Sequence, residues 1–120
     1  EFADVVTEAL VPLFPDDPPR FLERTPHGYS DREQIAAELV AAGYSGAPDF
    51  DTVTARSRAA EPALPAIAYC QGTPLRKEIE QRDPAALDRA TELATAALAA
   101  RFGAGSVEGK IQGKVVTVRA

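Results

Sequence analysis

Only two segments of this 120-residue chain have the composition of β-strands, and they lie far apart in the sequence. Residues 50–57 are rich in β-branched side chains, and residues 110–119 read KIQGKVVTVR, with Gly113 as a candidate bulge. Two strands form at most one pair, which is only marginally stable in water without further packing. Each strand would also keep one edge open to another chain. The sequence therefore predicts an unfinished sheet, completed by another part of a parent protein or by a second copy of this chain.

Apolar residues at three- and four-residue spacing predict short helices in most of the remaining chain, which ten prolines and eight glycines punctuate. The predicted helical segments are 2–14, 20–24, 30–43, 62–71, 73–81 and 83–102. Much of their apolar surface is alanine, which buries little area per residue. We therefore expect an α+β fold that is mainly helical, with a thin core and two antiparallel strands.

The boundaries of these helices follow from local signals. Ser30 and Glu33 form a capping box at the start of the third segment, and Gly43 would end it in a left-handed conformation. Thr73 and Asp83 are each followed by proline, which is the pattern of an N-cap before the first helical position. Residues 1–120 are thus expected to form a single unit without a long linker.

Composition excludes several functional classes. The 18 acidic residues outnumber the 13 basic ones, and the net charge of −5 gives no broad surface for nucleic acid or for an anionic membrane. No apolar run approaches the roughly 20 residues that span a bilayer. We therefore expect no nucleic-acid partner, no membrane partner and a cytoplasmic location.

The single cysteine and single histidine exclude an internal disulfide and a zinc site built from several cysteines or histidines. Because the chain lacks methionine even at position 1, we also expect it to be a piece of a longer protein.

A few residues could carry chemistry. His27 could act as a general base, although a loop histidine that bonds to the backbone is the more common case. Cys70 lies on an apolar helix without a nearby charge, which favours a small buried side chain over a nucleophile. Arg56 and Arg58 lie on one face of the first strand and could hold a carboxylate or a phosphate, or form salt bridges. The adjacent carboxylates of Asp16 and Asp17 could bind a cation, but a turn with solvated charges is the simpler interpretation.

Several segments together resemble a known family. They are FPDDPP at 14–19, FLERTPHGY at 21–29, AAGY at 41–44, SRA at 57–59, YCQGTPLR at 69–76 and the closing strand. In this combination they resemble the C-terminal region of class I S-adenosylmethionine-dependent methyltransferases, of the bacterial type-11 methyltransferase-domain group. None of these segments is a catalytic signature.

The resemblance implies a place in a larger fold. The family has a mostly parallel, Rossmann-like sheet of seven strands with helices on both faces. This chain would supply the sixth and seventh strands as an antiparallel edge, with the three helices between them as an insertion. The glycine-rich loop and the acidic residue that hold S-adenosylmethionine in the family have no counterpart here. The cofactor would therefore belong to the parent enzyme, and none is expected for this chain alone.

The resemblance also implies a function, because the C-terminal region of such enzymes shapes the pocket for the methyl acceptor. From position and residue type, the candidate wall residues are Phe21, His27, Tyr29, Tyr69, Cys70 and Gln71. The parent would transfer a methyl group to a small-molecule acceptor, and this chain alone would be inactive. Two alternatives are a stand-alone homodimeric interaction or ligand-binding module without catalysis, and a small helical protein with a cavity around its aromatic residues. The unfinished sheet also predicts that the purified chain self-associates.

Overall fold

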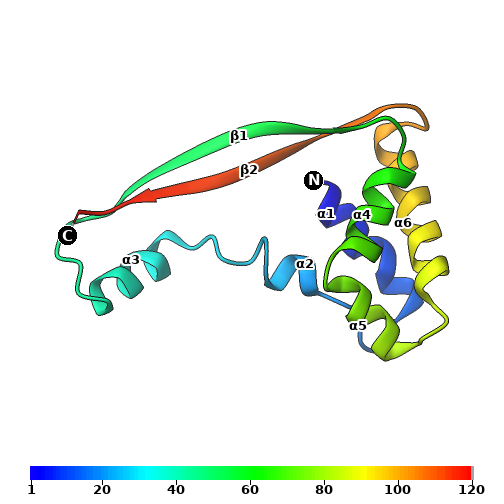
Figure 1. Ribbon diagram of the computed structural model, residues 1–120, viewed down its shortest axis with the longest axis horizontal. Helices are drawn as coiled ribbons and strands as arrows, with labels where there is room; N and C mark the ends of the chain where they lie inside the picture. The colour runs from blue at the N-terminus through cyan, green and yellow to red at the C-terminus, as the bar shows by residue number, and fades with distance from the viewer. Residues whose placement is uncertain (120) are drawn as a thin grey trace.

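The computed structural model describes residues 1–119 and shows an α+β fold with one two-stranded antiparallel sheet. Its elements are α1 (Phe2–Leu10), the 3₁₀ helix η1 (Val11–Leu13), α2 (Phe21–Arg24), α3 (Arg32–Ala41), β1 (Asp49–Ala59), α4 (Ala63–Gly72), α5 (Leu75–Arg82), α6 (Leu87–Phe102) and β2 (Val107–Thr117). All helices except α3 pack into a body at one end, and the two strands form a long ribbon that leaves it (Figure 1). The predicted α+β class and the antiparallel pairing of the two strands are confirmed, and about half of the chain is helical.

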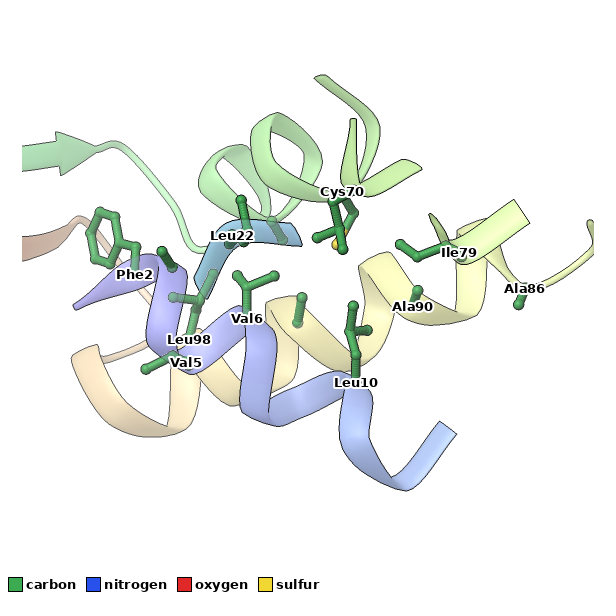
Figure 2. Packing of buried hydrophobic residues seen from close by; sticks show 14 of the residues in the cluster. Phe2, Val5, Val6, Leu10, Leu22, Cys70, Ile79, Ala86, Ala90 and Leu98 are labelled. Atoms are coloured by element: carbon green, nitrogen blue, oxygen red, sulfur yellow. The ribbon is translucent and has the colours of Figure 1, made fainter. Parts of the chain in front are cut away.

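The core lies in the helical body, between α1, α4, α5 and α6 (Figure 2). The long helix α6 contributes Ala90, Ala94 and Leu98, each fully buried. Alanine at two of these positions lets α6 approach α1 and α4 closely, since no large side chain separates the helices. Leucine and isoleucine side chains from the other helices, such as Leu10 and Ile79, fill the remaining space. The core is therefore built from small contact residues and a few large ones, as the alanine content predicts.

The ribbon pairs β1 with β2 over eleven residues each, from Asp49 opposite Thr117 to Ala59 opposite Val107. Eleven residues of strand span roughly 35 Å, which accounts for the elongated shape of 50 × 31 × 20 Å. The register is unbroken, and Gly113 lies directly opposite Val53. The predicted bulge at Gly113 is therefore wrong, because every residue of β2 there has one partner on β1.

The base of the ribbon is anchored to the body through Phe2. Its ring packs edge-on against Phe102, with the ring centres 5.1 Å apart. The same ring lies against Gly109, where an added Cβ would sit 2.8 Å from the ring carbon Cε1. Val107 on the same face of β2 is buried in the core. A side chain at position 109 would thus push the ribbon away from α1.

The far end of the ribbon carries α3. The guanidinium of Arg32 lies over the ring of Phe50, 5.5 Å from its centre, and Lys114 donates a hydrogen bond to the carbonyl of Ser30. Phe50 and Lys114 lie on the face of the ribbon opposite to the one that Val107 presents to the body. Yet Figure 1 shows α3 and the body on the same side of the ribbon. The right-handed twist that accumulates along two strands accounts for this change of face.

The cap of α3 differs from the prediction. Asp31, and not Ser30, is the N-cap, and its carboxylate accepts hydrogen bonds from the backbone N–H groups of Glu33 (2.8 Å) and Gln34 (3.3 Å). Because the cap is Asp31 and not Ser30, α3 begins at Arg32, one residue later than predicted. Gly43 ends this segment with a φ of 94°, in the left-handed region expected from the sequence.

Of the other two predicted N-caps, Thr73 and Asp83, only Thr73 bonds to the first residue of a helix. The hydroxyl of Thr73 accepts a hydrogen bond from the backbone N–H of Leu75 at 3.2 Å, where α5 begins. Asp83 accepts a hydrogen bond from the N–H of Ala85 at 2.9 Å, but it caps a separate turn, and α6 begins only at Leu87. The longest helix is therefore shorter at its start than predicted.

Candidate functional site

A groove of about 780 Å³ runs beneath the ribbon. Its roof is β2, its floor is α3 with the loop that precedes it, and its closed end is formed by the start of α1 and one side chain of α4. Apolar side chains from α3 and β2 line it, namely Ile35, Leu39, Ile111 and Val116. The volume lies within the range of about 300–1,000 Å³ that is typical of small-molecule sites.

The loop between α2 and α3 brings two of the predicted residues, His27 and Tyr29, to the groove. The backbone N–H of His27 donates to the carbonyl of Leu22 at 3.2 Å, so the chain folds back onto α2. Gly28 permits this close turn, since an added Cβ would lie 2.5 Å from the carbonyl oxygen of Arg24. The glycine after the histidine therefore fixes where both ring side chains leave the loop.

Tyr29 is tied to α3 by its hydroxyl, which donates a hydrogen bond to Glu38. The other carboxylate oxygen of Glu38 accepts from the side-chain amide of Gln34 at 2.9 Å. The bond to Glu38 raises the pKa of the Tyr29 hydroxyl above its ordinary value, and both hydrogen bonds lower the pKa of the Glu38 carboxyl. This edge of the groove therefore presents an ionised carboxylate that is already hydrogen-bonded on both oxygens.

Tyr69 of α4 reaches the closed end of the groove, beside the start of α1. It is half-buried, and burial raises the pKa of its hydroxyl, with a further rise from the negative charge of Asp4. The hydroxyl is therefore neutral at physiological pH and can donate a hydrogen bond to a ligand. Three predicted wall residues, His27, Tyr29 and Tyr69, thus lie on one groove although they are distant in sequence.

The other three predicted residues do not lie on this groove. Phe21 packs against the core of the body. Cys70 is fully buried and directed into the core (Figure 2), and burial raises the pKa of its thiol to about 11. Gln71 donates from its side-chain amide to the hydroxyl of Thr91 at 3.1 Å and lines a separate shallow pocket between α4 and α6. The buried thiol agrees with the interpretation of Cys70 as a small core side chain.

The two arginines of β1 have an internal partner. The Nε of Arg56 lies 2.6 Å from one carboxylate oxygen of Glu108, and Arg58 bonds to the other oxygen. These two hydrogen bonds lower the pKa of Glu108. Arg56 and Arg58 therefore form a surface salt bridge across the ribbon, which was one of the two interpretations from the sequence.

The acidic turn before α2 also has a partner within the chain. Asp17 forms an ion pair with Arg82 of α5, with 2.9 Å between the carboxylate oxygen and Nη2. Arg82 also donates to the backbone carbonyls of Asp17 and Glu78. This turn therefore fastens the connection after η1 to the body. Among residues 1–119, no cluster of three potential metal-ligating side chains occurs.

Glu38, Lys110 and Lys114 line the groove and were not among the predicted site residues. Glu38 lies next to an apolar position of its helix, and no motif marks it in the sequence. The lysines alternate with apolar residues along β2, as they would on any half-exposed strand. Only the fold of the ribbon over α3 turns these three residues toward the same space.

Comparison with models of known protein families finds no match to this sequence, and comparison with curated proteins also finds none. Within the described part of the chain, no helix has both the length and the apolar character needed to cross a membrane.

Proposed function

We propose that this chain forms the acceptor-binding part of an S-adenosylmethionine-dependent methyltransferase and that a small-molecule acceptor occupies the groove beneath the ribbon. The proposal rests on the resemblance of its sequence segments to the C-terminal region of the class I enzymes. A cytoplasmic location belongs to the same proposal.

The structural observation that supports the proposal is the outer edge of β2, on which no strand lies among residues 1–119. The amino group of Glu1 donates to the backbone carbonyl of Lys110 at 3.2 Å, and its carboxylate accepts from the N–H of the same residue. These bonds show that the backbone N–H and C=O of Lys110 face away from β1, where a neighbouring strand would bond them. A strand placed there would add to the sheet on the β2 side, where the resemblance puts the cofactor-binding half.

The groove supplies what binding an acceptor needs. Its apolar walls can bury the body of a small molecule, while the Tyr69 hydroxyl and the imidazole of His27 can orient its polar atoms. The imidazole of His27 can also act as the general base for the proton that an acceptor hydroxyl or amine must lose. No position of this chain matches the residues that hold S-adenosylmethionine in the family, so these residues are assigned no step that involves it.

Calorimetric titration with S-adenosylmethionine tests this division of roles. The 120-residue chain, shown to be folded by circular dichroism, should give no binding heat. The same chain extended by the residues that its gene encodes before Glu1 should bind saturably. Saturable micromolar binding by the 120 residues alone would refute the proposal, and so would an extended chain that is folded but does not bind.

A further inference from the structure

The outer edge of β1 is a strand edge of eleven residues with an uncharged middle. Because Lys110 directs its backbone groups away from β1, toward Glu1, the alternation of an antiparallel ladder fixes the direction of the others. The outward groups of β1 are therefore those of Phe50, Thr52, Thr54, Arg56 and Arg58. No strand other than β2 pairs with β1 among residues 1–119.

The two edges of the ribbon differ in how they resist pairing. The β2 edge is occupied at Lys110 by Glu1, and it carries a second lysine, Lys114, and a glycine, Gly113. Lysine is one of the usual devices that protect a strand edge, and glycine has a low preference for strands. The middle of β1 reads TVT, with no charge, proline or glycine. A second chain therefore meets less resistance at β1 than at β2.

The charges of β1 favour one particular partner. Its first three residues hold Asp49 and Asp51, and its last four hold Arg56 and Arg58. The two arginines share the single carboxylate of Glu108, so the basic end keeps a net positive charge. A second copy in antiparallel orientation puts the acidic end of each strand beside the basic end of the other, with the aspartates on one face of the sheet and the arginines on the opposite face. A parallel arrangement would put like charges together.

We propose that two copies of this chain pair antiparallel along β1, with Thr54 on the two-fold axis. This register overlaps all eleven residues of both strands, since Asp49 then lies opposite Ala59 of the partner strand. Each Thr54 N–H donates to the Thr54 carbonyl of the other copy. The pairing is isologous, as expected of a homodimer, and turns two ribbons into one four-stranded sheet.

The pairing also joins the apolar surface of the two copies. Val53, Ile111 and Val115 share one face of the ribbon and are 56, 44 and 50 % exposed. In the proposed register Val53 lies opposite Ala55 of the other copy, so the apolar side chains of both ribbons form one continuous patch. The proposal does not depend on the proposed function, which concerns the β2 edge and the groove.

Two proline variants at directly opposite positions test the proposal by sedimentation velocity. Thr54→Pro removes an N–H that points out of the β1 edge and leaves the internal ladder intact. Gln112→Pro does the same at the β2 edge, since Gln112 lies opposite Thr54. The unmodified chain should dimerise reversibly in the micromolar range. Thr54→Pro should weaken the dimer about tenfold or more, because both hydrogen bonds on the axis are lost, and Gln112→Pro should leave it unchanged.

Amide hydrogen exchange on the unmodified chain gives a second readout that needs no variant to fold. Exchange at Thr52, Thr54 and Arg56 should slow as the protein concentration rises, and exchange at Gln112 and Lys114 should not. A monomer at all accessible concentrations, a dimer that responds only to Gln112→Pro, or concentration-dependent protection confined to β2 would each overturn the proposal.

Discussion

Replacement of Gly109 by alanine should destabilise the protein, whereas the same change at Gly113 should not. Both glycines lie on the same face of β2, four residues apart. At Gly109 the new methyl group would lie 2.8, 2.9 and 3.3 Å from three ring carbons of Phe2. At Gly113 no atom lies within 4 Å of the new methyl group. The two substitutions therefore make the same chemical change and differ only in whether the new methyl group meets the Phe2 ring.

The magnitudes follow from two opposing effects. An extra methyl group in a packed site costs about 1–3 kcal/mol. Replacing glycine by alanine also lowers the conformational entropy of the unfolded chain, which raises the free energy of unfolding by about 0.4–1 kcal/mol. We therefore expect Gly109→Ala to lower the free energy of unfolding by about 0.5–2 kcal/mol and Gly113→Ala to raise it by about 0.4–1 kcal/mol.

Urea unfolding followed by far-ultraviolet circular dichroism measures both free energies, with the slope as a check on the two-state assumption. A second pair of variants isolates the cause. In a Phe2→Ala background the ring is absent, and Gly109→Ala should no longer destabilise. If Gly109→Ala were neutral in the unmodified protein, or equally harmful without the Phe2 ring, the ribbon would not be anchored through this contact.

Three other outcomes are expected. Leu98→Ala should lower the free energy of unfolding by about 2–5 kcal/mol in the same urea assay, because a fully buried side chain is truncated. Burial raises the pKa of the Cys70 thiol from an ordinary 9.0 to about 11, so the folded chain keeps this proton to higher pH than the unfolded chain does. The free energy of unfolding should therefore fall progressively between about pH 9 and 11. The fall should be smaller in Cys70→Ala. Tyr29→Phe should raise the pKa of Glu38 toward its ordinary value in a carbon-13 titration, because the hydrogen bond from Tyr29 is the largest cause of its lowering.

The elements of the fold could be predicted because their signals are local. Alternation marks both strands, and a positive-φ glycine ends α3 at Gly43. The errors concern which residue caps a helix and whether a glycine interrupts a strand. Asp31 displaces Ser30 as the cap because its carboxylate reaches the two N–H groups, and Gly113 forms no bulge because the strands match in length. No local pattern could show that the twisted ribbon folds over α3.

The candidate site divides for a simple geometric reason. Tyr69, Cys70 and Gln71 are consecutive on α4, and each residue of an α-helix is rotated about 100° from the last. One therefore faces the groove, the next the core and the third α6. Residues adjacent in a helical motif cannot all line one pocket. His27 and Tyr29 do reach the same groove, because their loop has no such rotation.

The ribbon is held at both ends and not in its middle, and this explains where a partner would act. Phe2 fixes its base to the body, and Arg32 and Lys114 connect its far end to α3. Between these supports Val53 lies opposite Gly113, a pair that supplies one apolar side chain and no cross-strand contact. Two strands alone are marginal in water, so this central part gains most from an added strand. A second copy centred on Thr54 would supply its hydrogen bonds where the ribbon has the least support of its own.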